Sequence, residues 1–147
     1  MGYMNGTARF GETLSQLILE FGITNRELAK AIGVSEPTVC RWRALSDGVG
    51  LRNLVALCRY FKCSLEYLAG RTESDIKPTS FTIENFGAQL RKFMKEKSIS
   101  TYKFRKDTGL GGRILYDWDR GSDPKLSTLI ELATYFNCSL DELVGLE

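Results

Sequence analysis

Apolar residues recur at helical spacing along most of the chain, and no segment alternates apolar and polar residues with the period of two that strands require. In the first stretch, Leu14, Leu17, Ile18 and Phe21 fall on one helix face. We therefore predict an all-α protein. Combined with the capping signals, the pattern predicts short helices at about 9–21, 25–32, 36–44, 51–61, 65–69, 83–97, 101–108, 112–120, 126–136 and 140–144.

The predicted helix starts follow from side chains that can accept a hydrogen bond from a free backbone N–H group. Thr24, with Glu27 three residues later, forms a capping-box sequence. Later helices receive the same kind of cap from Ser35, Ser64, Thr82 and Ser139, the last with Glu142 as its box partner.

The pattern of core and turn positions in the first half of the chain returns in the second half. The matched positions include Phe10-Gly11, Leu14, Ile23, Gly33 and Trp42, which recur as Phe86-Gly87, Leu90, Ile99, Gly109 and Trp118. A register kept over about sixty residues indicates a duplicated domain. We predict one domain at 1–70, a polar linker at 71–80 and a second domain at 81–147, here called repeat 1 and repeat 2.

Length and composition fit two small helical domains. The 147 residues allow two units, each near the lower size at which a domain buries an adequate core. No apolar run approaches the ~20 residues of a membrane span, and the chain start lacks a secretory signal, so we expect a soluble, cytoplasmic protein without a membrane partner. Four cysteines without C-x-x-C spacing and no histidine predict reduced thiols and no metal or cofactor.

Residues 25–44 have the pattern of two helices joined by a tight turn. Ala29 is small where the helices would cross, and Gly33 allows the unusual backbone angles of the turn. The apolar positions that close the core are Leu28, Ile32, Val34, Val39 and Trp42. Such an arrangement holds the second helix at the surface, where its N-terminal half can enter the major groove of DNA.

The segment Ile23-Thr-Asn-Arg-Glu-Leu-Ala-Lys-Ala-Ile-Gly-Val-Ser-Glu-Pro-Thr-Val-Cys-Arg-Trp42 resembles the helix-turn-helix of the Cro and phage-repressor-like transcription regulators. Trp118-Asp-Arg-Gly-Ser-Asp-Pro-Lys-Leu-Ser-Thr-Leu-Ile-Glu-Leu-Ala133 is similar to that family's passage from the recognition helix into the fourth helix. The resemblance implies two tandem five-helix lambda-repressor-like domains. It further implies a sequence-specific double-stranded DNA-binding regulator, bacterial or phage-borne, that represses by occluding a promoter.

The resemblance also implies which residues contact DNA in repeat 1. Base-reading positions open the third helix and lie one turn further on: Glu36, Pro37, Cys40 and Arg41. The forked guanidinium of Arg41 can pair with both acceptors of a guanine, which is worth about 1–3 kcal/mol of discrimination. Glu36 can accept a hydrogen bond from a cytosine amino group, or it can simply interact favourably with the helix dipole, and both interpretations stay open. Phosphate contacts are expected from Asn25, Arg26, Lys30, Arg43 and Ser46.

Repeat 2 departs from this pattern. Arg105 replaces Ala29, and a long charged side chain at a helix crossing must either push the helices apart or run outward along the surface. Gly111-Gly112 opens the recognition helix, and Asp117 replaces Arg41. The equivalent base-reading positions are Gly112, Arg113 and Asp117, and the phosphate-facing positions are Tyr102, Lys103 and Lys106. Contact of this repeat with DNA is left open.

One further pair distinguishes the repeats. The family often pairs an arginine on the first helix with an acid after the recognition-helix tryptophan, and Arg91 with Asp119 fits this pattern. The equivalent residues in repeat 1 are Ser15 and Arg43, so we expect Arg43 to be free to bind phosphate.

Catalysis finds little support, because the chain has no histidine, no G-x-S-x-G sequence, no phosphate loop and no metal-ligand cluster. The rival to DNA binding is a protein-interaction module, antitoxin-like or anti-repressor, in which one repeat binds a protein partner or mediates homodimerisation. The short linker keeps the repeats close, which favours a single chain acting as a pseudo-dimer over two half-sites about one DNA turn apart.

Overall fold

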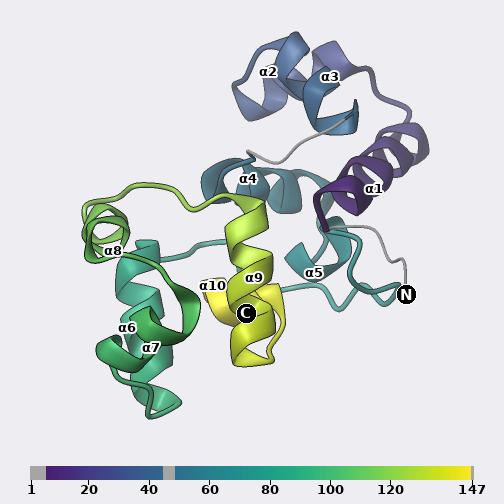
Figure 1. Cartoon of the computed structure of the whole chain (residues 1–147). Coiled ribbons are helices and arrows are strands. Elements are labelled where there is room, and N and C mark those ends of the chain that lie inside the picture. The colour runs from purple at the N-terminus through teal and green to yellow at the C-terminus, as the bar shows by residue number, and fades with distance from the viewer. Residues whose placement is uncertain (1–5, 45–48, 147) are drawn as a thin grey trace.

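The computed structural model of the chain describes residues 6–44 and 49–146. These residues form helices α1 (Gly6–Phe21), α2 (Asn25–Ile32), α3 (Glu36–Ala44), α4 (Leu51–Phe61), α5 (Leu65–Leu68), α6 (Phe86–Glu96), α7 (Thr101–Thr108), α8 (Gly112–Asp119), α9 (Leu126–Phe136) and α10 (Leu140–Val144) (Figure 1). The all-α prediction is confirmed. Within the described ranges, none of these helices is long and apolar enough to cross a membrane.

Most of the predicted caps form. At α2 the capping box is complete, because the Glu27 N–H donates to the Thr24 hydroxyl and the Thr24 N–H donates to the Glu27 carboxylate. Ser35 accepts from the Thr38 N–H at 3.3 Å. Ser64 and Ser139 cap α5 and α10 in the same way. Because these bonds form, the predicted starts of α2, α3, α5 and α10 agree with the structure.

The predicted cap at Thr82 is wrong. The side chain of Asn85 caps α6 instead, accepting from the Ala88 N–H at 2.9 Å. The preceding residues are not helical, and Phe81 and Ile83 among them pack partly buried against the core. At α10 the Ser139 hydroxyl accepts from the Glu142 N–H at 3.0 Å and donates to the Glu142 carboxylate at 3.5 Å. The return bond of the predicted box, from the Ser139 N–H to the Glu142 carboxylate, is not formed.

Each repeat brings its first and third helices very close together. A Cβ atom at Gly11 of α1 would lie 2.7 Å from the Arg43 carbonyl oxygen of α3, and one at Gly87 of α6 would lie 2.7 Å from the Asp119 backbone nitrogen of α8. Only glycine permits this approach. The core beneath it holds Phe10 and Trp42 in repeat 1.

The repeats pack against each other through equivalent residues. Gly50 and Lys125 form an isolated antiparallel bridge, in which Leu51 N–H donates to the Pro124 carbonyl at 3.0 Å and Leu126 N–H donates to the Val49 carbonyl at 2.8 Å. Residues 49–51 are the counterparts of 124–126 in the repeat register. The contact therefore has approximate twofold symmetry within one chain.

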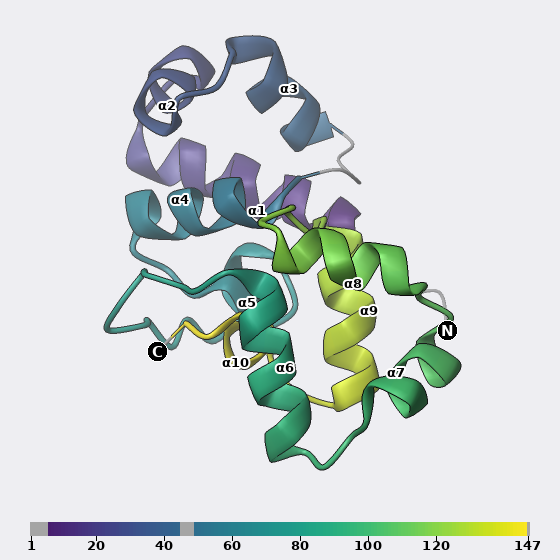
Figure 2. The same cartoon turned by 90° about the vertical axis from the view of Figure 1, so that its left-hand side faces the viewer.

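A second reciprocal contact joins α5 and α10, which lie together near the middle of the molecule (Figures 1 and 2). The Asp141 carboxylate accepts from the Leu65 and Glu66 N–H groups at 2.8 and 3.0 Å, and the Glu66 carboxylate accepts from the Leu140 N–H at 2.8 Å. Glu66 and Asp141 occupy equivalent positions, so each repeat caps the last helix of the other.

The segment joining the repeats is fastened to repeat 1. Asp75 accepts from the Ser64 N–H at 2.9 Å, and the Lys77 ammonium donates to the Lys62 carbonyl at 2.8 Å. Further along, Arg59 donates to the Phe81 carbonyl at 3.0 Å. The polar residues predicted as a linker are thus hydrogen-bonded to residues at the ends of α4 and α5.

Candidate nucleic-acid interface

In repeat 1 the turn between α2 and α3 is tightly closed. Gly33 adopts φ +89°, and the N–H groups of Gly33 and Val34 both donate to the Ala29 carbonyl, at 2.8 and 3.0 Å. Ala29 itself is buried where the two helices cross. The residue types that sequence analysis singled out here have the predicted structural roles.

The inner face of α3 fixes which residues point outward. Val39 and Trp42 are buried, and they anchor the helix to the core. The four predicted base-reading residues lie on the exposed side of α3: Glu36, Pro37, Cys40 and Arg41. Thr38, which sequence analysis did not single out, accepts a hydrogen bond from the Arg41 guanidinium at 3.2 Å and so helps to orient it.

The expectation that Arg43 is free is wrong. Its guanidinium is half-buried and donates to the Ser15 hydroxyl at 3.0 Å and to the Asn25 side-chain oxygen at 2.8 Å. The Asn25 amide donates in turn to the Cys40 sulfur at 3.3 Å. Repeat 1 thus has Arg43 where repeat 2 has Asp119, and this arginine forms a hydrogen-bond network of its own because Ser15 and Asn25 supply neutral acceptors.

The other predicted phosphate contacts of repeat 1 are on the surface. Arg26 and Lys30 are exposed on α2. Ser46 lies outside the described residues. The exposed cations on α2 and Arg41 on α3 leave repeat 1 with the surface chemistry that phosphate and base contacts require.

In repeat 2 the corresponding helices are not packed against each other as α2 and α3 are (Figure 2). Gly109 adopts φ +76° and its N–H donates to the Arg105 carbonyl at 2.9 Å, as at Gly33. The next N–H, that of Leu110, turns instead to the Thr108 hydroxyl at 3.3 Å. The second bond that closes the turn of repeat 1 is therefore replaced.

The two separated helices are held by different neighbours. On one side, the Tyr135 hydroxyl of α9 donates to the Asp107 carboxylate of α7 at 2.7 Å, and Phe104 stacks on Phe136. On the other side, Trp118 of α8 meets Phe86 of α6 at a ring-centroid separation of 5.1 Å. In repeat 2, therefore, α7 packs against α9 whereas α8 packs against α6.

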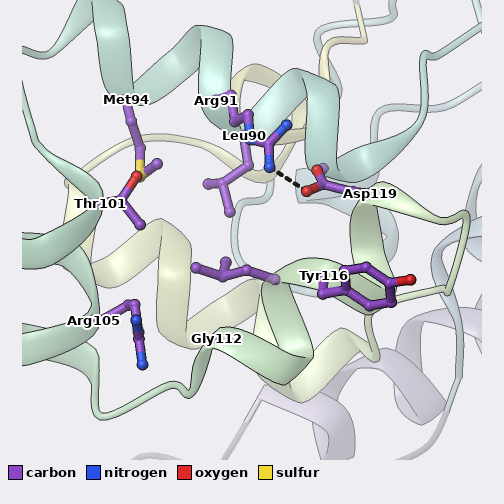
Figure 3. Close-up of a pocket in the computed structure, with 10 residues that line it drawn as sticks. Leu90, Arg91, Met94, Thr101, Arg105, Gly112, Tyr116 and Asp119 are labelled. Atoms are coloured by element: carbon purple, nitrogen blue, oxygen red, sulfur yellow. Dashed lines mark hydrogen bonds and ion pairs between the residues drawn. The ribbon is translucent and has the colours of Figure 1, made fainter.

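Both expected consequences of Arg105 are observed: the helices are apart, and the side chain runs outward. The helices stand apart at this point, and the exposed side chain runs along the surface with its guanidinium about 3.5 Å from where a Cβ atom of Gly112 would be. Leu115, which occupies the position of the fully buried Val39, is only partly buried. A cavity of about 250 Å³ opens between α6, α7 and α8 (Figure 3).

Half of the predicted DNA contacts of repeat 2 are paired with one another or with a nearby acid. Arg113 is exposed, but its guanidinium pairs with Asp117 at 3.1 Å, and Gly112 is half-buried. Lys103 pairs with Asp107 at 2.9 Å, and this hydrogen bond raises the pKa of Lys103. Tyr102 and Lys106 are exposed.

Tyr116 of α8 is not among the contact residues expected from the sequence. It stands at the position of Cys40 and is 53% exposed, and the Arg120 guanidinium lies over its ring at 5.5 Å from the centroid. The repeat register could have identified this residue, because it places an aromatic ring where repeat 1 has a predicted base reader.

These features define a tandem helix-turn-helix protein with one closed and one open motif. The chain matches the family model of the Cro/C1-type HTH DNA-binding domain over residues 13–73 and again over residues 89–147, and it belongs to this family. Both the predicted family and its two tandem copies are confirmed. Comparisons with curated proteins and with solved structures returned no match. The family assignment supports a DNA-binding regulator.

Proposed function

We propose that the protein is a sequence-specific regulator of transcription, a repressor that inserts α3 of repeat 1 into the major groove and occludes a promoter. The observation that carries this proposal is the closed motif of repeat 1. Buried Val39 and Trp42 fix the inner face of α3, and Arg41 extends from its exposed face. A rigid helix with an exposed guanidinium one turn from its start suits the reading of a guanine edge.

The remaining contacts divide by chemistry. Glu36, Pro37 and Cys40 accompany Arg41 on the exposed side of α3 and face base edges. Arg26 and Lys30 on α2 neutralise phosphates and set the register of the protein on the duplex. The hydrogen bond from Arg43 to Asn25 positions α2 against α3. The remaining N–H groups of these two side chains face the phosphate backbone of the DNA.

The test is selection of bound sequences from random double-stranded DNA with the full chain, repeated with two variants. Arg41→Ala removes a bidentate base contact, so it relaxes the consensus at one or two base pairs and costs about 1–3 kcal/mol on the preferred site. Lys30→Ala is the matched control, because loss of a phosphate contact weakens all sequences alike and lowers the salt dependence. An unchanged consensus for Arg41→Ala contradicts this use of α3.

We further propose that one chain binds as a covalent pseudo-dimer. The approximately twofold contacts of Gly50 with Lys125 and of α5 with α10 support this, because a symmetric pair of repeats matches two half-sites. The half-sites differ, since Glu36, Pro37 and Arg41 are replaced by Gly112, Arg113 and Asp117.

Footprinting combined with the mass of the complex tests the pseudo-dimer. One chain protecting two unlike half-sites about one turn apart is expected. Two chains protecting a palindrome with identical halves would instead make one repeat a dimerisation surface.

Repeat 2 also supports a second candidate function, in which it binds a protein partner. Its helix-turn-helix is open, its predicted base readers Arg113 and Asp117 pair with each other, and Tyr102 and Tyr116 are exposed. Exposed tyrosines are typical of protein-binding surfaces. Steep loss of affinity with salt and a defined enriched site favour DNA binding, whereas a stable protein complex without DNA preference favours this alternative.

A further inference from the structure

The cavity between α6, α7 and α8 is a feature of repeat 2 that DNA binding does not explain. It measures about 250 Å³, and α6, α7 and α8 each contribute to its walls (Figure 3). Pockets for drug-sized ligands measure roughly 300–1,000 Å³, so this one suits a compact molecule of about one ring with a short substituent. It is too small for a nucleotide or an extended peptide.

In repeat 1 the equivalent positions are filled by protein atoms. Arg43 crosses this space to reach Ser15 and Asn25, and Val39 is fully buried beneath it. The counterparts in repeat 2 are Asp119, Arg91, Thr101 and Leu115, and all four line the cavity. The same scaffold therefore closes this space in one copy and leaves it open in the other.

The walls of the cavity combine an apolar floor with an unneutralised cation. Leu90 and Met94 of α6 form the floor together with Leu115 of α8. At one end, Arg91 is paired with Asp119, so that end carries no net charge. At the other end the Arg105 guanidinium lies beside Gly112, and among the described residues no carboxylate lies within ion-pair distance of it (Figure 3).

We propose that this cavity binds a small organic acid, whose carboxylate pairs with Arg105 and whose compact aromatic or apolar body lies on Leu90, Met94 and Leu115. The planar guanidinium fork matches a carboxylate in geometry and charge. The apolar floor favours a hydrophobic body over a free inorganic anion. An occupant touches α7 and α8 together, so it sets the position of the open helix-turn-helix. The inference does not depend on DNA binding by either repeat.

The experiment is a titration of the isotopically labelled full chain with phenylacetate, followed by amide NMR shifts. Phenylacetamide, the neutral amide of the same shape, is the matched ligand. Arg105→Gln keeps an unbranched polar side chain, although a shorter one, and removes its charge. Arg113→Gln removes another exposed charge, on α8, that does not line the cavity, and it serves as the control variant.

We expect saturable shifts at residues of α6, α7 and α8 with phenylacetate at millimolar concentration, and weaker binding of phenylacetamide. Arg105→Gln lowers the affinity for phenylacetate by about tenfold or more, while Arg113→Gln leaves it unchanged. The proposal is overturned by the absence of saturation, by equal affinity for the two ligands, by equal losses in the two variants, or by shifts confined to α2 and α3.

Discussion

Repeat 1 and repeat 2 share the register of their helices, the glycine turn and a buried tryptophan in the third helix, yet their second and third helices are packed differently. In repeat 1, Ala29 lets α2 and α3 cross closely, and the backbone carbonyl of the same residue closes the turn. In repeat 2, Arg105 stands at that position and the helices are separate. A family fold thus tolerates opening of its defining motif when each half has another partner.

Those other partners explain why repeat 2 remains folded. The α7 helix is held by Phe104 and by the bond from Tyr135 to Asp107, whereas the equivalent of Asp107 in repeat 1 is Ala31. The α8 helix is held by the packing of Trp118 on α6. Contacts to the first and fourth helices therefore hold the second and third helices of repeat 2 where these two do not pack against each other.

The largest effect is expected from moving the arginine into repeat 1. Ala29→Arg forces a long charged side chain into a buried crossing, so it lowers the free energy of unfolding by about 3 kcal/mol and weakens DNA binding. The reverse change, Arg105→Ala, alters an exposed residue and shifts stability by no more than about 0.5 kcal/mol. Urea unfolding followed by circular dichroism measures both, and equal effects would remove this explanation of the difference.

The contact between the repeats is symmetric in position but not in strength. Asp141 accepts from two backbone N–H groups, whereas Glu66 accepts from one. Asp141→Ala should therefore cost about 2 kcal/mol of stability and Glu66→Ala about 1 kcal/mol. Glu142→Ala, next to Asp141 but exposed and outside the contact, is the control. A larger loss for Glu66→Ala than for Asp141→Ala would reverse the assigned order.

Sequence alone predicted the helices because their signals are local. Helical spacing and the side chains of Thr24, Ser35, Ser64 and Ser139 act within one or two turns, and the structure has them where expected. The prediction for Thr82 failed because the packing of its neighbours Phe81 and Ile83 against the core is a long-range contact, which a local capping signal does not reveal.

The candidate site was predictable only where it depends on one helix. The exposed side of α3 follows from the burial of Val39 and Trp42, which the period of the pattern reveals. The reciprocal caps of Glu66 and Asp141 join residues far apart in sequence, and no local pattern encodes them. The network of Arg43 required knowing that Ser15 and Asn25 both meet it in space.

A smaller effect distinguishes the two arginines that connect the first and third helices. Arg43 is half-buried and donates to two neutral oxygens, so Arg43→Ala should cost about 1 kcal/mol of stability. Arg91 pairs with Asp119 but its side chain is 68% exposed, so Arg91→Ala should cost only a few tenths, about 0.3 kcal/mol. Thermal unfolding of both variants provides the measurement, and a greater loss for Arg91→Ala would contradict it.

The smallest effects concern two carboxyl groups whose pKa values shift in opposite directions. Hydrogen bonds from Tyr135 and Lys103 lower the pKa of Asp107, so its contribution to stability is present above the ordinary pKa and is lost as pH falls through the folded value. Burial raises the pKa of Asp141 despite its backbone donors, so the part of its contribution that depends on protonation is complete below the ordinary pKa and is lost as pH rises through the folded value. The ionised carboxylate keeps its hydrogen bonds from the Leu65 and Glu66 N–H groups.

Carboxyl NMR titration of the full chain resolves the two groups. Asp107 should titrate below the usual range of an aspartate and Asp141 above it. Tyr135→Phe removes the strongest donor to Asp107, so the pKa of Asp107 should return towards its ordinary value while that of Asp141 stays in place. A change in the pKa of both groups in this variant would mean that the bond between Tyr135 and Asp107 is coupled to the contact between the repeats. Independent titration instead means that the bond between Tyr135 and Asp107 and the contact between the repeats are not coupled.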